Sequence, residues 1–255
     1  MMNIETLNLH AGYDDKKVLS DVSVTIQENR ITGVIGPNGS GKSTLLKCIY
    51  RIIEPTEGMI MVNGQSIKDM SYKESAKEIA VLMQHHGESL EMTAEDIVLM
   101  ARNPYKGIFE RDYEEDYEIA HKAMDETGVY QFKNIFYSDL SGGEQQRVML
   151  ARTIAQETPC IILDEPTNHL DITYQLQIMN LISERQLTVV AAIHDLNIAA
   201  LYCDELIAMK EGRIVVAGPT REVLTSELIY TLYGVDASVF EHNGHLVVAY
   251  ERGGL

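Results

Sequence analysis

The stretch GVIGPNGSGKSTLL, residues 33–46, places glycines, a lysine and hydroxyl side chains between two apolar runs. Gly36, Gly41, Lys42 and Ser43 satisfy the pattern G-x-x-x-x-G-K-[ST], whose backbone N–H groups surround a polyphosphate while the lysine and hydroxyl reach the phosphates and Mg²⁺. ITGVIG before the loop predicts a short buried strand, and KSTLLKCIYRI after it predicts a helix. The loop then lies at a helix N-terminus, which favours anions. An ordinary glycine-rich turn is the alternative, but this context favours nucleotide binding.

Composition limits the class of protein. A chain of 255 residues fits one large domain, or a domain with an inserted lobe. Its apolar runs, such as VVAAI at 189–193, are far shorter than a bilayer span, and the opening MMNIETLNLH lacks a signal-peptide profile, so we expect a cytosolic chain not itself embedded in a membrane. Cys48, Cys160 and Cys203 lack C-x-x-C spacing and are expected to be reduced thiols. The formal net charge of −17 disfavours a nucleic-acid partner.

The order of predicted elements indicates an α/β fold. SDVSVTIQ alternates like a half-buried strand and MIMVNGQ runs into an Asn63-Gly64 turn, which suggests an antiparallel β lobe beside the loop. Residues 93–137 are predicted to form an inserted helical lobe, and residues 236–250 a C-terminal hairpin. Strands at CIIL, TVVAAI, ELIAM and RIVVAG, separated by helical stretches, predict a mostly parallel sheet with covering helices.

The helical stretch carries two finer predictions. Tyr113, Tyr117, Ala120 and Met124 share one face at helical spacing, so that face is expected to pack inward. The run ERDYEEDYE, residues 110–118, has six acids and one arginine, and a solvated helix face is its expected role.

The stretch CIILDEPTNHLD, residues 160–171, ends a buried strand in acids. Ligands of open α/β sheets gather at the carboxyl ends of strands. Asp164 is predicted to hold Mg²⁺, directly or through water, and Glu165 to accept a proton from an attacking water. The alternative is that the two acids only cap a helix.

The stretch DLSGGEQQRVMLAR, residues 139–152, predicts a second helix start. Ser141 and Glu144 have the spacing of a capping box. A plain helix start needs no glycines, whereas Gly142 and Gly143 would let a second phosphate-bearing surface approach the N–H groups of the first turn.

The loop, LSGGEQQR, IILDEP, NHLD and a histidine after VVAAI occur in an order that resembles the ATP-binding subunits of ABC transporters over essentially the whole chain. The resemblance implies an ATPase with a P-loop NTPase core that uses Mg²⁺ with ATP and pairs head to tail as a dimer. Ser141, Gly142, Gly143 and Glu144 of one copy would then close over the ATP held by the other copy, with Asp171 coupling the two sites. It also implies an integral-membrane permease as partner, a periplasmic or lipoprotein substrate-binding protein as an indirect one, and a peripheral location on the cytoplasmic face of the membrane.

The remaining roles also come from the resemblance. Gln84 would meet Mg²⁺ and the attacking water, and His194 would contact the γ-phosphate, although a lone strand-end histidine is more often structural. Tyr13 would stack on adenine, unless it only packs in its early loop. The ATP-binding set is Tyr13, Gly36, Pro37, Asn38, Gly39, Ser40, Gly41, Lys42, Ser43 and Thr44, the metal set is Ser43, Gln84 and Asp164, and the catalytic set is Glu165, His194 and Gln84.

The cargo class is inferred from further likenesses. KEIAVLMQ, EDIVLMARNPY and LIYTLYGVDASVF resemble importer subunits for iron siderophores, haem or vitamin B12, although that group would have a proline at Met83 and a glycine at Ala101. A soluble ABC ATPase that drives cytosolic assembly, for example of iron–sulfur clusters, shares every catalytic motif and is the alternative. A DNA-acting ABC ATPase usually needs long coiled-coil inserts or a second cassette. His242 and His245 flank the hairpin turn and, like His85 and His86, are expected to be solvated rather than metal ligands.

Overall fold

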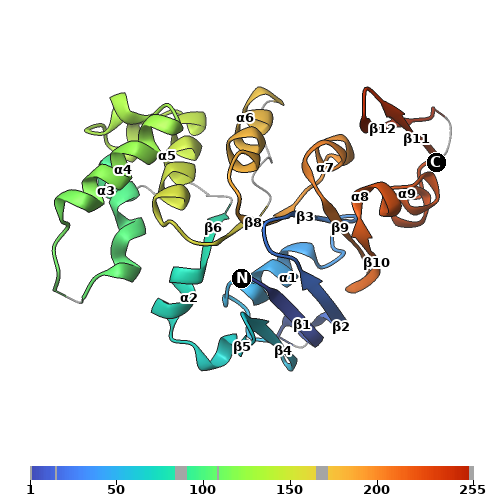
Figure 1. Ribbon diagram of the computed structural model, residues 1–255. Helices are drawn as coiled ribbons and strands as arrows, with labels where there is room; N and C mark the ends of the chain where they lie inside the picture. Colours follow the sequence, from blue (N-terminus) through green and yellow to red (C-terminus); the bar gives the residue numbers. More distant parts are fainter. Residues whose placement is uncertain (1, 15, 84–90, 108, 165–171, 253–255) are drawn as a thin grey trace.

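A six-stranded sheet forms the centre of the molecule in the computed structural model, which describes residues 2–14, 16–83, 91–107, 109–164 and 172–252 (Figure 1). Its strand order is β10-β9-β3-β8-β7-β6, and every neighbouring pair is parallel except β10 with β9. The strands are β3 (Ile31–Ile35), β6 (Ile79–Met83), β7 (Cys160–Asp164), β8 (Thr188–Ala192), β9 (Glu205–Lys210) and β10 (Arg213–Pro219). The prediction of a mostly parallel α/β sheet is confirmed.

Side chains of the central strands alternate between two hydrophobic cores, because successive residues of a strand point to opposite faces. Cys160 and Ile162 of β7 pack into a core with helix α1 (Lys42–Ile49), whereas Ile161 and Leu163 pack into a core formed with other helices. Strands buried on both faces are therefore largely apolar. In β3 and β8 the polar residues are Thr32 and Thr188, and in β7 the polar residue is Asp164 at its end.

A second sheet covers the outer side of α1, so this helix is enclosed between two sheets (Figure 1). The sheet is antiparallel with the order β2-β1-β4-β5, and Asn63 and Gly64, both at positive φ, make the turn between its last two strands. Its strands are β1 (Ile4–Tyr13), β2 (Lys16–Ile26), β4 (Glu57–Val62) and β5 (Gln65–Ser66), followed by the 3₁₀ turn η1 (Ile67–Asp69).

Helices gather beyond the β6 edge of the central sheet (Figure 1). Ala120 and Met124 are fully buried, as their spacing predicts, but Tyr117 is 37% exposed and Tyr113 59% exposed. The prediction is wrong for both tyrosines: Tyr113 is the N-cap residue and precedes the first turn of the helix, whereas Tyr117 lies within the helix and is nonetheless exposed. The elements are α2 (Tyr72–Glu78), α3 (Ala94–Leu99), η2 (Met100–Tyr105), α4 (Glu114–Glu126), η3 (Tyr130–Phe132), η4 (Tyr137–Asp139) and α5 (Gly142–Ala155).

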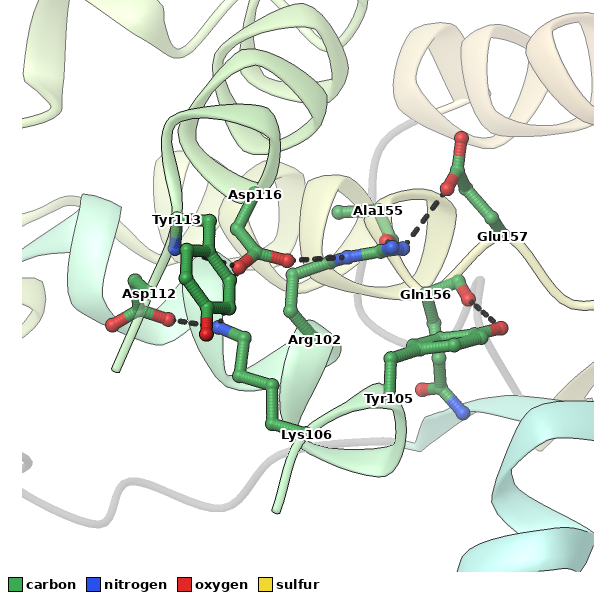
Figure 2. A network of polar contacts seen from close by, with 9 residues as sticks. All are labelled: Arg102, Tyr105, Lys106, Asp112, Tyr113, Asp116, Ala155, Gln156 and Glu157. Carbon is green, nitrogen blue, oxygen red and sulfur yellow. Dashed lines mark hydrogen bonds and ion pairs between the residues drawn. The ribbon is translucent and has the colours of Figure 1, made fainter. Parts of the chain in front are cut away.

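A buried ion network joins these helices (Figure 2). Arg102 Nε lies 3.2 Å from Asp116 Oδ1, and Lys106 Nζ lies 3.0 Å from Asp116 Oδ2. The three side chains are only 9%, 7% and 9% exposed, in the order Arg102, Lys106 and Asp116. The expectation of a solvated face over residues 110–118 is therefore wrong at Asp116. This carboxylate turns inward because Arg102 of η2 and Lys106, the residue after η2, neutralise its charge.

The C-terminal part, from residue 172 on, contributes helices to the face of the central sheet opposite α1. It ends in a hairpin, at the opposite end of the molecule from the helices of the β6 edge (Figure 1). The three cysteines are free and buried, as expected for reduced thiols. Among the described residues, none of the helices is long and apolar enough to cross a membrane. The elements are α6 (Ile172–Ser183), α7 (Leu196–Tyr202), α8 (Thr220–Val223), α9 (Ser226–Tyr233), β11 (Ala237–His242) and β12 (His245–Tyr250).

Candidate nucleotide-binding site

The glycine-rich loop connects the buried end of β3 to the first turn of α1. The ammonium of Lys42 is held by two carbonyls of the loop itself, that of Gly36 at 2.8 Å and that of Pro37 at 3.2 Å. The first turn of α1 contains no acidic residue, so within that turn no carboxylate offsets the positive end of the helix dipole. The loop thus carries a lysine ammonium and leads into a helix N-terminus, and these are the two features that favour phosphate binding.

Two glycines of the loop are required by its backbone. Gly36 has φ +148°, and a Cβ there would stand 2.1 Å from the carbonyl oxygen of Met209 in β9. Gly41, the N-cap residue of α1, has φ +103°, and a Cβ would stand 2.7 Å from Leu19 of β2. The loop therefore folds tightly against neighbouring strands of both sheets, and at these two positions a side chain would collide with those strands.

Parallel pairing brings the other candidate residues to the same edge of the sheet. Asp164 ends β7 and pairs in register with Met83, while Ala192 of β8 pairs with Val34 of β3 just before the loop. His194 follows β8 by two residues and is partly buried. Asp164 is 7% exposed, so its carboxylate is largely shielded from solvent. Its electrostatic attraction for a cation at this edge of the sheet is therefore stronger than that of an exposed carboxylate.

A tyrosine missed in the sequence analysis contacts Asp164. The hydroxyl of Tyr50, the C-cap residue of α1, donates a hydrogen bond of 2.8 Å to Asp164 Oδ2. Burial, followed by the charge of Asp164 and this hydrogen bond, raises the pKa of Tyr50, so the phenol stays a donor at neutral pH. The only signal in the sequence was a polar-tipped aromatic residue two helical turns after Lys42, which is too common a pattern to indicate a site.

The second predicted helix start is formed by the beginning of α5. The backbone N–H of Ser141 donates to Glu144 Oε2 at 2.8 Å and its hydroxyl donates to the same oxygen at 2.6 Å, and these two bonds lower the pKa of Glu144. A Cβ on Gly142 would meet nothing within 4 Å, whereas one on Gly143 would touch the ring of Tyr174 in α6. The open side of this helix start is therefore at Ser141 and Gly142, both exposed to solvent.

Tyr13 lies at the end of β1 with its side chain 46% exposed. It pairs with Lys16, at the beginning of β2, and further along the same strand Leu19 reaches the loop at Gly41. Tyr13 thus stands on the strand pair that borders the phosphate loop. Its role in stacking on adenine stays a prediction.

Three candidate residues, Gln84, Glu165 and Asp171, lie outside the described residues, as do His85 and His86. Among the described residues there is also no group of three or more His, Cys, Asp or Glu side chains that could hold a metal ion. Mg²⁺ is usually held by one or two carboxylates together with substrate phosphates, and Asp164 with the hydroxyl of Ser43 fits that donor set. The residues present thus suit a metal that arrives with a nucleotide.

Comparison with known proteins agrees with this geometry. The family model described as ABC transporter matches residues 19–168. The chain is 38% identical over 237 residues to the ferric enterobactin transport ATP-binding protein FepC of Escherichia coli (strain K12), covering 91% of this chain and 88% of that protein. An inward-facing structure of an ABC transporter of the metal-chelate type superposes with a TM-score of 0.84 at 26% identity, covering 98% of this chain and 97% of that one. A dimeric ATP-binding cassette with ADP and phosphate bound superposes with a TM-score of 0.76 at 29% identity, covering 86% and 99%.

Proposed function

Because the chain belongs to the ABC transporter family and is one of its ATP-hydrolysing subunits, we propose that it powers the import of an iron chelate across a membrane. The cargo class of an iron siderophore, haem or cobalamin-type chelate is supported by a relative named for ferric enterobactin and by a structural neighbour of the metal-chelate type. The observation that supports the ATP-hydrolysing part of the proposal is the parallel order of β3, β8 and β7, because it sets the phosphate loop, His194 and Asp164 at one edge of the sheet.

Each residue at this edge has a distinct task in the proposed reaction. Lys42 and the N–H groups of the loop, from Gly36 to Thr44, bind the phosphates, and Ser43, Asp164 and Gln84 hold Mg²⁺, which neutralises charge on the phosphates. His194 orients the γ-phosphate. Glu165 accepts the proton of the attacking water, a contribution of about 10² to 10⁴ in rate.

The exposed start of α5 supports a shared site between two copies. Ser141 and Gly142 face solvent, and Gly142 leaves room for another surface to approach its N–H group. Each ATP would then contact Lys42 of one copy and Ser141 of the other, with Asp171 coupling the two sites. A dimeric relative with ADP and phosphate bound is consistent with this pairing.

A groove beside the site suits a helix of a permease. It has a volume of about 330 Å³ between α1, α2, β6 and α5, and its lining combines apolar side chains, among them Met83 and Met149, with polar ones, among them Arg51, Arg152 and Gln156. Tyr72 on α2 is 73% exposed and Met83 41% exposed, so apolar surface faces outward directly before Gln84 in the chain. We place the subunit on the cytoplasmic face of the membrane, where the helical lobe of residues 93–137 moves together with the permease. A substrate-binding protein acts on the subunit only indirectly, through the permease.

Nucleotide binding is tested first by thermal unfolding. Mg²⁺ with ATP should stabilise the protein by about 2.7 kcal/mol when free ligand is about 100 times Kd. Lys42→Ala should abolish most of this shift, since it removes the cation held inside the loop. A wild-type shift in Lys42→Ala would contradict the phosphate assignment.

The shared site is tested by trapping it. Glu165→Gln keeps the shape of the side chain but removes the base, so ATP should stay bound between two subunits and light scattering should report a dimer that depends on ATP. Adding Ser141→Arg, which blocks the open start of α5, should return the monomer mass. A Glu165→Gln variant that hydrolyses ATP at the wild-type rate would exclude Glu165 as the base.

The transport role is tested by purification from native membranes. An integral-membrane protein should be recovered with the wild-type subunit, and its transport assay identifies the cargo. Tyr72→Glu should reduce that recovery without changing ATP binding, whereas Tyr230→Glu, at a 59% exposed position on α9, should not. Recovery of a cytosolic assembly complex instead would favour the iron–sulfur type of ATPase.

A further inference from the structure

A hydrogen bond joins Tyr50, at the end of the helix that follows the phosphate loop, to Asp164, at the end of β7. The helix that begins with Lys42 ends at Tyr50, and the tyrosine hydroxyl reaches Asp164 Oδ2 on β7 at 2.8 Å. The two residues are 114 positions apart in the sequence. The contact is therefore a product of the fold, in which α1 packs across the central strands.

The position of the phenol is fixed by its surroundings. The backbone N–H of Tyr50 donates to the carbonyl of Leu46 at 2.9 Å, which continues the helix to this residue. Its side chain packs against the core that α1 shares with β7 and β8. A rigid donor placed against a buried carboxylate favours the carboxylate orientation that accepts its hydrogen bond.

We propose that Tyr50 is a positioning residue for Mg²⁺ binding, whose hydroxyl holds the carboxylate of Asp164 in its metal-binding orientation. The inference rests on the proposed function, in which Asp164 is a ligand of Mg²⁺. Hydrogen-bond donors behind a ligating carboxylate orient it before the metal arrives, and their removal typically costs about 10- to 100-fold in metal affinity. The hydroxyl touches neither nucleotide nor metal in this role, and it acts only through Asp164.

The test measures Mg²⁺ binding separately from turnover. A fluorescent, non-hydrolysable ATP analogue is held at fixed concentration and Mg²⁺ is titrated, so that the half-saturating Mg²⁺ concentration is read from the nucleotide signal. Tyr50→Phe keeps the ring and removes the hydroxyl, and it should raise this concentration about 10-fold. Affinity for the analogue in EDTA should stay within about twofold, since the loop contacts of Lys42 are untouched. Tyr202→Phe is the matched control, because that hydroxyl also donates to a side-chain oxygen, Asn180 Oδ1, at 2.7 Å, and should leave the Mg²⁺ requirement unchanged.

A double-variant comparison separates positioning from a general structural role. Asp164→Asn should itself raise the Mg²⁺ requirement, and in that background Tyr50→Phe should add less than about twofold, since the tyrosine has no charged ligand left to orient. An unchanged or lower Mg²⁺ requirement in Tyr50→Phe would overturn the inference, and so would a full effect that persists in Asp164→Asn. If Asp164→Asn leaves the Mg²⁺ requirement unchanged, the proposed function of Asp164 fails instead, which distinguishes the two results.

Discussion

Replacing Arg102 by methionine should weaken the packing of the helices at the β6 edge more than any ordinary surface change. The Nε atom of Arg102 lies 3.2 Å from Asp116 Oδ1, and one terminal nitrogen donates to the carbonyl of Ala155 at 2.9 Å and to Glu157 Oε2 at 2.9 Å (Figure 2). The guanidinium also lies over the ring of Tyr105, 4.4 Å from its centre. Methionine fills much of the same volume but supplies none of these donors.

The magnitude follows from what each partner loses. Removing one partner of a buried ion pair costs about 3–5 kcal/mol, because the other charge is left in a poorly solvated place. Asp116 keeps Lys106, 3.0 Å away, and the backbone N–H of Tyr113 at 2.9 Å, so the lower end applies. Glu157 is 55% exposed and adds well under about 1 kcal/mol. The lost bond to the carbonyl of Ala155 adds about 1 kcal/mol, which brings the total to about 4 kcal/mol.

Urea unfolding of wild type, Arg102→Met and Arg221→Met at pH 7 measures this difference. With a slope of about 3 kcal/mol per molar urea, the midpoint of Arg102→Met should fall by more than about 1 M. Arg221 is the matched control, since it pairs with Glu241 at 3.0 Å but both side chains are more than half exposed, and its loss should cost under about 1 kcal/mol. Equal midpoints for the two variants would refute the claim that burial of the network is what makes it stabilising.

Three further predictions concern Asp116, Gly36 and Asn197. Although burial alone would raise the pKa of Asp116, its three hydrogen-bond donors hold the pKa below the usual range. The ionised carboxylate therefore contributes its full stabilisation at neutral pH, and this is lost as the pH falls through the lowered pKa. The free energy of unfolding in urea should accordingly depend less on pH below about 4 in Asp116→Asn than in wild type. Gly36→Ala should destabilise by about 3 kcal/mol or more in thermal unfolding because its Cβ meets a carbonyl at 2.1 Å, whereas Gly39→Ala, with no atom within 4 Å of the new methyl, should cost about 1–2 kcal/mol. Asn197 of α7 exchanges two hydrogen bonds with the backbone of Val248, at 3.2 and 2.8 Å, so Asn197→Ala should cost about 2 kcal/mol and speed hydrogen exchange at the Val248 amide.

The central sheet and the phosphate loop were predictable because their signals are local. The strands 31–35 and 188–192 are apolar at every position or nearly so, which is what burial on both faces requires. The loop of residues 36–41 carries glycines where the backbone needs positive φ or close contact. Parallel pairing then places Asp164 and His194 at the same edge of the sheet as the loop, so this placement follows from motif order and topology together.

The contacts of Asp116 and Tyr50 could not be predicted in the same way, because their hydrogen-bond partners lie on other helices or strands that only the fold brings close. Asp116 stands in a run of acids that looks solvated when charge is counted locally, and only the fold brings Arg102 of η2 and the carbonyl end of α5 to the same place. Tyr50 is one of 13 tyrosines, so its residue type carried no information until α1 was seen to cross β7.

Helix α5 links the proposed partner-facing surface to β7, the strand that ends at the proposed metal ligand Asp164. It begins beside Ser141 and runs 14 residues, about 21 Å, to Ala155, whose carbonyl is held by Arg102. After a short connection, residues 156–159, the chain enters β7, which ends at Asp164. The side chain of Gln156 donates to the carbonyls of Ala76 and Ile79, at 2.6 and 3.2 Å, and so fixes the same helix end to α2 and β6. The far end of α5, at Ala155 and Gln156, is therefore fixed by the ion network and by the side chain of Gln156. If the exposed start of α5 is displaced, we expect the movement to be transmitted to the neighbouring helices rather than absorbed by bending within α5.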